Sequence, residues 1–252
     1  LFIMFSELIN IILIVSLVTI QSIAGVGILV VGTPALLLLD FSIIETMNYL
    51  LPISIITSLL NIFVMKYQSN SFYYNLDRIK IFFFICIPFV LFGLIILKYT
   101  NEFINYDYLV SAIIILTLIL RKKISPILKG FSLRINKIIL MVIGIIHGLT
   151  NSGGALLSIL LSSLNNSKKE SRSEITLFYF FLALIQFILF YFIFGLSQNI
   201  YKFHLVIIYI IIGTILGNIL LKFTTESMFI KLIFFLALVS STSLILKNII
   251  SN

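Results

Sequence analysis

The chain has 252 residues, of which 61% are hydrophobic and only 10% are charged. A soluble domain of this length cannot bury so much apolar side chain, so the composition excludes a soluble globular protein and predicts an all-α polytopic membrane protein. The formal net charge is +8, but the basic residues stand in short connections between apolar runs. That distribution is typical of membrane topology, and we expect no binding to nucleic acid.

Apolar runs suited to crossing a membrane divide the chain into regions, since a spanning helix needs about 20 apolar residues. The eight predicted regions are 8–39, 43–65, 79–97, 108–120, 138–164, 175–194, 203–221 and 228–246. The longest and most basic connection is 121–137. Because lysine and arginine near span ends resist translocation, we expect this linker in the cytoplasm. It separates two predicted membrane repeats, 1–120 and 138–252.

The first region, 8–39, is too long for one straight crossing, and it is interrupted. Gln21, Gly25 and Gly27 stand where a simple spanning helix would carry leucine or isoleucine. A glycine in a helix interior costs about 1 kcal/mol relative to alanine, and polar groups at membrane depth need partners. Such a break is tolerated where it is buried in protein or lines a cavity. We therefore interpret 21–27 as half of a site.

The fifth region carries a second break, at 147–154. An offset of half the 252-residue chain aligns Gln21 with His147 and also aligns Gly25 with Asn151. Two such breaks predict an internal duplication, with two pseudo-symmetric halves of four regions each. Each broken region is either a re-entrant hairpin, which makes the halves inverted, or a broken span, which makes them parallel. Basic residues follow the second break, and their charge favours hairpins.

The breaks predict a site for a small anion. A break frees backbone N–H groups at the start of the following half-helix, where the helix dipole is positive. Two such ends facing each other near mid-membrane would bind an anion without lysine or arginine, and neither stands well inside a predicted span. The alternative is that the glycines only permit close helix packing. The predicted substrate-binding residues are Gln21, Gly25, Val26, Gly27, His147, Asn151, Ser152, Gly153 and Gly154.

Three polar residues are candidates for a proton or polar pathway: His147, Asn48 and Gln186. His147 either relays a proton or binds the substrate, or it is a neutral imidazole bonded to a backbone carbonyl. The amides of Asn48 and Gln186 must find partners at membrane depth. Hydrogen bonding between helices is the more common role for such amides.

At the two glycine-rich stretches the sequence resembles the sulfite exporter TauE/SafE family of membrane permeases. Members carry in each half a motif of roughly G-x-G-G-G, followed by an apolar stretch and a proline. The matching residues are Gly25, Gly27 and Pro34 in the first stretch and Gly148, Gly153 and Gly154 in the second. Ile28 and Leu29 depart from the motif, and Asn151 replaces a glycine.

The resemblance implies a secondary transporter for a small anion, such as sulfite, a sulfonate or a related organosulfur or carboxylate compound. We expect a multi-pass protein of the cell membrane, the bacterial inner membrane, whose partners are the lipid bilayer and the anion. The motif departures leave the substrate open. The sequence also leaves open the direction and energy coupling of transport, the sidedness of the termini and the oligomeric state.

Two other classes compete with a transporter. An intramembrane hydrolase would use Ser152 as nucleophile, but the usual G-x-S-G is absent and His147 stands in the same segment. We expect no catalytic residues and no enzyme. The single cysteine, Cys86, and the absence of a Cys/His cluster predict neither metal nor cofactor. A non-transporting membrane subunit or scaffold is the second alternative, although a scaffold would not need two paired polar breaks.

Overall fold

The computed structural model describes residues 2–69, 72–128, 133–165, 167–195, 203–223 and 225–251, and within these ranges it is helical with no strand. Three helical stretches are long and apolar enough to cross a membrane, namely Ile43–Tyr67, Leu76–Thr100 and Lys169–Phe194. Shorter apolar helices surround them. These helices confirm the prediction of an all-α membrane protein, with three stretches long enough to span.

The helices follow the predicted regions closely. Those up to residue 128 are α1 (Phe2–Ala24), α2 (Ile28–Leu38), α3 (Ile43–Ser69), α4 (Leu76–Ile81), the π-helical turn η1 (Phe82–Cys86), α5 (Ile87–Thr100) and α6 (Tyr106–Leu128). Those from residue 133 are α7 (Leu133–Thr150), α8 (Gly154–Leu164), α9 (Lys168–Phe194), α10 (Phe203–Leu220) and α11 (Glu226–Ser251). Helices α6 and α7 extend into most of the predicted linker 121–137, because arginine, lysine and leucine are good helix formers.

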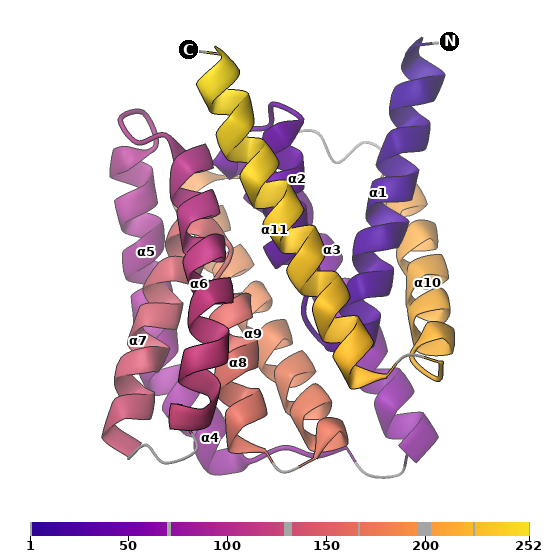
Figure 1. Ribbon diagram of the computed structural model, residues 1–252, viewed down its shortest axis with the longest axis vertical. Coiled ribbons are helices and arrows are strands. Elements are labelled where there is room, and N and C mark those ends of the chain that lie inside the picture. The colour runs from indigo at the N-terminus through magenta and orange to yellow at the C-terminus, as the bar shows by residue number, and fades with distance from the viewer. Residues whose placement is uncertain are drawn as a thin grey trace.

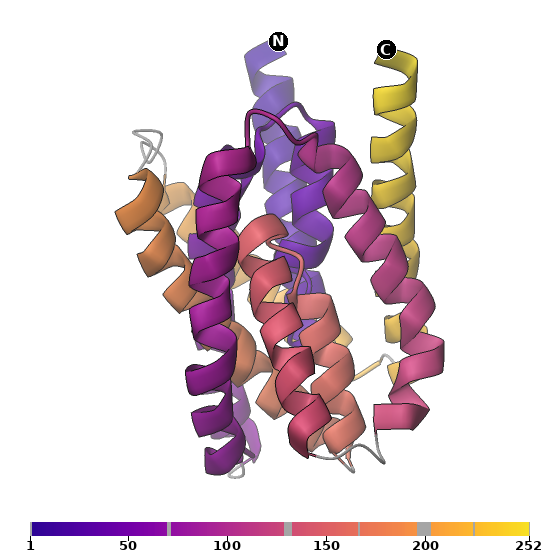
Figure 2. The same cartoon turned by 90° about the vertical axis from the view of Figure 1, so that its left-hand side faces the viewer.

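Both broken regions form hairpins of two helices (Figures 1 and 2). Helix α1 descends from the end of the molecule that carries both termini, and α2 returns to that end. Helix α7 rises from the opposite end, and α8 returns there. The hairpins therefore enter from opposite ends. Between them, α3, the continuous α4–η1–α5 rod, α6, α9, α10 and α11 connect the two ends.

Glycine pairs bring two helix pairs into close contact. Gly213 and Gly217 of α10 face α1, where an added Cβ would lie 2.8 Å from the Thr19 carbonyl oxygen at Gly217. Gly144 and Gly148 of α7 face the backbone carbonyls of the η1–α5 rod in the same way. Both pairs are spaced as in G-x-x-x-G, the small-residue pattern that lets membrane helices approach. Gly148, which matches the family motif, is thus a packing glycine.

The outward faces of the helices are apolar. Many large hydrophobic side chains are exposed along α3, η1, α5, α9 and α10, among them Phe63, Phe84, Phe192 and Ile215. Exposed side chains of this kind are stable against lipid and unstable against water. The polar side chains at membrane depth are instead buried within the bundle, around the two breaks.

Candidate functional site

The two breaks have one backbone feature in common. Gly25 and Asn151, which the half-chain offset aligns, both have positive φ, at 77° and 64°. The N–H of each donates to the carbonyl four residues earlier, at 2.7 Å for Gly25 and 2.8 Å for Asn151. Glycine and asparagine are the residues that adopt this left-handed conformation most readily. Asn151 therefore takes the structural place of the glycine that the motif has there.

The amino end of α2 is filled by oxygen atoms of the chain itself. The N–H of Ile28 donates to Gln21 Oε1 at 3.3 Å, and the N–H of Leu29 donates to the Tyr179 hydroxyl at 3.1 Å. Gln21 is fully buried and is held by α3, because its Nε2 donates to the Ser54 carbonyl at 3.0 Å and to Ser58 Oγ at 2.9 Å. Two oxygen acceptors thus stand at the positive end of this half-helix.

Tyr179 of α9 contacts both breaks. Its hydroxyl accepts from the amino end of α2, and its ring lies so close to Gly154 that a Cβ there would collide with the ring edge. Gly154 is the first residue of α8. One fully buried side chain therefore lies against the amino ends of both half-helices.

Asn151 joins the second break to the first hairpin. Its Nδ2 donates to Thr33 Oγ1 of α2 at 3.2 Å, while its Oδ1 is buried without a hydrogen-bond partner. Ser152 Oγ donates to the Thr150 carbonyl at 3.1 Å. The amino end of α8 begins at Gly153 and has no side-chain cap. Helices α2 and α8 are in direct contact, so the two breaks form one polar centre.

His147 and Gln186 adjoin this centre. Gln186 Nε2 donates to the His147 backbone carbonyl at 3.0 Å, and its Oε1 has no partner. The imidazole is fully buried, and neither ring nitrogen makes a hydrogen bond of acceptable geometry, although the Gln186 side chain lies beside it. The centre therefore holds several buried polar atoms without hydrogen-bond partners. Such atoms are rare in the interiors of native proteins.

The chain was compared with known proteins. A family model described as Sulfite exporter TauE/SafE matches residues 9–245. The chain belongs to the sulfite exporter TauE/SafE family. No curated protein and no solved structure matches it. The family is one of membrane permeases, so this chain is a membrane transporter family member with apolar helices that fit that class.

The predicted site residues of this TauE/SafE family member do not all face the polar centre. Gly25 packs against α9, where an added Cβ would lie 2.6 Å from Thr176 Oγ1. The Val26 side chain lies in the hydrophobic core. An added Cβ at Gly27 would meet Ile20 at 2.7 Å, and one at Gly153 would meet His147 Cβ at the same distance. These glycines form the tight turns, and the polar side chains beside them form the polar centre.

Of the predicted pathway residues, Gln186 lies at the polar centre and Asn48 lies further along α3. Gln186 lies beside the centre through its bond to His147. Asn48 is half-buried on α3, next to Met47, whose sulfur accepts from Gln186 Nε2 at 3.8 Å. The side chain of His204, the other histidine, lies outside the described residues.

Sequence reasoning missed two functional candidates on α9. Tyr179 lies in an aromatic run that reads as lipid-facing. Arg172 lay outside the predicted span 175–194, but α9 begins at Lys168 and places Arg172 beside the first break. The missed signal is a capping box, since Ser167 Oγ accepts from the Glu170 N–H at 3.2 Å and Glu170 stands at the third helical position. The predicted span 175–194 therefore began too late, because the first turns of α9 include Arg172.

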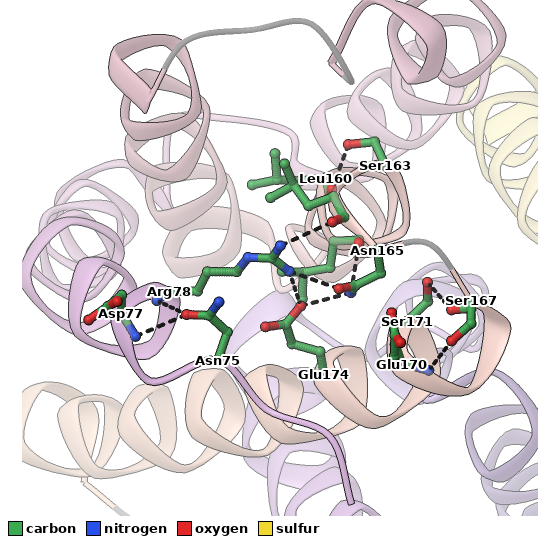
Figure 3. A network of polar contacts seen from close by, with 12 residues as sticks. Asn75, Asp77, Arg78, Leu160, Ser163, Asn165, Ser167, Glu170, Ser171 and Glu174 are labelled. Carbon is green, nitrogen blue, oxygen red and sulfur yellow. Dashed lines mark hydrogen bonds and ion pairs between the residues drawn. The ribbon is translucent and has the colours of Figure 1, made fainter.

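A second polar cluster ties the helices together at the end opposite the termini (Figure 3). Arg78 of α4 forms an ion pair with Glu174 of α9 at 2.6 Å and donates to the Leu164 carbonyl at 3.0 Å. Asn165, between α8 and α9, accepts from Arg78 at 2.9 Å and donates to Glu174 at 2.8 Å. Positive and negative charge compensate each other here, so we interpret this cluster as structural.

Proposed function

We propose that the chain is a secondary transporter for a small anion, namely sulfite, a sulfonate or a related organosulfur or carboxylate compound. We place the anion between the amino ends of α2 and α8. The observation that carries this proposal is the pair of backbone donors at Ile28 and Leu29, which the chain's own oxygens occupy at 3.3 and 3.1 Å. Gln21 Oε1 and the Tyr179 hydroxyl stand where oxygens of a bound anion would stand.

Electrostatics at this position favours negative charge. A helix amino end carries roughly +0.5 charge and unpaired donors, and it binds anions without basic side chains. The α8 end has no side-chain cap and touches α2, so both ends act on one ligand. The polar side chains around them are fully buried, so water screens little of this interaction.

The unpartnered polar atoms support a ligand in the same place. His147, Asn151 and Gln186 are fully buried and each leaves a polar atom without a hydrogen bond. Such an atom destabilises the folded state by about 1–3 kcal/mol. An imidazole N–H would donate to an anion oxygen, and the amides would orient it. His147 and Gln186 are therefore the proposed polar pathway at the side of the site.

We further propose that the chain consists of two inverted repeats, 1–120 and 138–252, that move against each other to alternate access. Hairpins that enter from opposite ends support this symmetry. So do the helix contacts, because α1 packs on α10 while α7, its counterpart, packs on α5, the counterpart of α10. Helices α3 and α9, which follow the hairpins, pack on each other between the halves.

Charge supports one orientation in the membrane. Most of the described basic side chains gather at the end opposite the termini, which we call the basic end: Lys66, Arg78, Lys80, Lys137, Lys169, Arg172 and Lys222. At the other end the described basic side chains are Lys98 and Lys247. Because cytoplasmic loops carry the excess of lysine and arginine, we place the basic end in the cytoplasm of a bacterial cell and both termini outside it.

Flux in proteoliposomes tests the function. We would measure uptake of labelled sulfite, methanesulfonate and acetate by the wild type and by a Gln21→Leu, Asn151→Gly double variant. Glycine at 151 removes the amide but tolerates the positive φ. The matched control is Thr117→Ala with Ser163→Ala, two buried hydroxyls bonded within their own helices.

We expect flux of at least one anion in the wild type and in the control, and loss of that flux in the double variant. Equal flux in all three proteins would contradict the site at the breaks. Absence of flux for every anion, from protein that elutes as one folded species, would contradict the transporter and favour the non-transporting subunit.

A further inference from the structure

Arg172 reaches the first break from the start of α9. Its Nη2 donates to the Ser22 carbonyl at 2.5 Å and to Asn218 Oδ1 of α10 at 3.2 Å. Ser22 lies in the last turn of α1, and an added Cβ at Gly25 would lie 3.2 Å from the Arg172 carbonyl oxygen. The guanidinium therefore adjoins the backbone that forms the break.

The charge of Arg172 has no counter-ion among the described residues. Its two hydrogen-bond acceptors are a neutral carbonyl and a neutral amide, and its Nε is buried without a partner. Glu174, two residues further along α9, pairs with Arg78 instead (Figure 3). The Arg172 side chain is partly buried. A charge that is removed from water without a counter-ion destabilises the fold, so its presence beside the break favours an anion there.

Arg172 also contacts a polar residue of α10. Asn218, which accepts from Arg172, lies at the edge of an open, mainly apolar groove of about 190 Å³ that Val64, Thr214, Ile215, Ile219 and Lys222 also line. Asn218 Nδ2 donates to Asn61 Oδ1 at 3.1 Å, and Asn61 donates to Ser22 Oγ at 3.0 Å. A continuous series of hydrogen bonds thus links Arg172 and Asn218 to Ser22 at the first break.

We infer that Arg172, the residue of the basic end that contacts the first break, supplies the fixed positive charge that the transported anion meets on its way to that break, and that this charge makes the path select anions. The inference rests on the proposed function and adds to it a residue that determines charge specificity. A guanidinium donates through a planar fork that fits the oxygens of sulfonate and carboxylate groups. The unpartnered Nε provides one arm of that fork.

Binding is measurable through the single cysteine. Cys86 is buried, so a maleimide dye reports its exposure on thermal unfolding. The probes are methanesulfonate and acetate, because sulfite itself adds to maleimides. We would titrate each probe and record the concentration that gives half of the maximal rise in unfolding temperature. The proteins compared are the wild type, Arg172→Lys, Arg172→Gln, Asn218→Asp and the control Lys66→Gln, which removes an exposed charge at the same end.

The variants separate charge from structure. Arg172→Lys keeps the charge, Arg172→Gln removes it, and Asn218→Asp neutralises it by placing a carboxylate where the Asn218 amide now accepts from Arg172. A charged hydrogen bond contributes enough for a tenfold change in affinity. We therefore expect the half-saturating concentration to rise about tenfold or more in Arg172→Gln and Asn218→Asp, to rise less in Arg172→Lys, which keeps the charge but loses the planar fork, and to change little in Lys66→Gln. If Arg172→Gln does not fold, the affinity of Asn218→Asp alone tests the inference. In that variant the arginine forms a new ion pair with the introduced carboxylate.

Two results would overturn the inference, and only one of them would also overturn the proposed function. Equal affinities in the wild type, Arg172→Gln and Asn218→Asp would remove Arg172 from the anion path and leave the proposed function standing. No stabilisation of the wild type by either probe would overturn the proposed anion site together with the role of Arg172.

Discussion

The hydroxyl of Tyr179 accepts a hydrogen bond from the backbone N–H of Leu29 at 3.1 Å, although the two residues are 150 positions apart. The ring of the same tyrosine lies on Gly154, the first residue of α8. One side chain of α9 thus closes the space between the two half-helix ends. In the proposed function this hydroxyl competes with the anion for the Leu29 donor.

Tyr179→Phe is expected to tighten anion binding. The variant keeps the ring on Gly154 and removes the internal acceptor, so Leu29 N–H becomes available to the ligand. One hydrogen bond contributes about 1 kcal/mol, which corresponds to roughly fivefold in affinity. Methanesulfonate titrated against thermal unfolding measures it. Weaker binding in the variant would show instead that the hydroxyl itself contacts the anion.

Asn151 is expected to accept glycine and to reject a β-branched residue. Its φ of 64° is a conformation that glycine adopts freely and that costs most other residues about 1–2 kcal/mol. Asn151→Gly should fold with a modest loss of stability from the lost bond to Thr33, whereas Asn151→Val should lower the unfolding temperature much further. Labelling of Cys86 during heating compares the two. Equal stability would mean that the second break relaxes out of this conformation.

The losses of stability from substituting Arg78 and Glu174 should be strongly non-additive, because the two side chains form an ion pair. The Glu174 side chain is fully buried and that of Arg78 is 26% exposed, so removing the cation alone leaves a buried carboxylate unpaired. We expect Arg78→Met to cost about 3–5 kcal/mol and the double variant Arg78→Met, Glu174→Gln to cost clearly less. Thermal unfolding of the four proteins of this cycle measures the coupling. Additive losses would mean that the pair makes no net contribution.

The hairpin topology predicts on which side of the membrane two exposed positions lie, one at each end of the molecule. Tyr67 at the basic end is 96% exposed, and Phe103 at the end of the termini is 84% exposed. An impermeant maleimide added to intact cells should label Phe103→Cys, whereas Tyr67→Cys should be labelled only after the membrane is opened. Wild-type protein is the control, because its single cysteine is buried. Labelling of both variants in intact cells would contradict the proposed orientation.

The helices and the positions of both breaks could be predicted from the sequence, because hydropathy and glycine spacing are local signals. The sequence did not distinguish a hairpin from a broken span, because α1 and α2 together are long enough for either. The basic residues after the second break only favoured the hairpin. Sequence reasoning missed Arg172 because an arginine before an apolar run looks like a loop residue until Ser167 is recognised as the helix cap. It missed Tyr179 because only the tertiary fold brings α9 between α2 and α8. Gly148 matched the motif, yet its position against Val90 reflects helix packing.

The location of a bound anion tests the paired-break site most directly. Selenite is the selenium analogue of sulfite, and anomalous diffraction at the selenium edge identifies its position in a crystal by element. We predict one main selenium peak at the amino ends of α2 and α8, with anion oxygens in hydrogen-bond range of the Ile28 and Leu29 N–H groups and Tyr179 displaced. Selenium found only at surface lysines, with the Leu29–Tyr179 bond intact, would contradict the site.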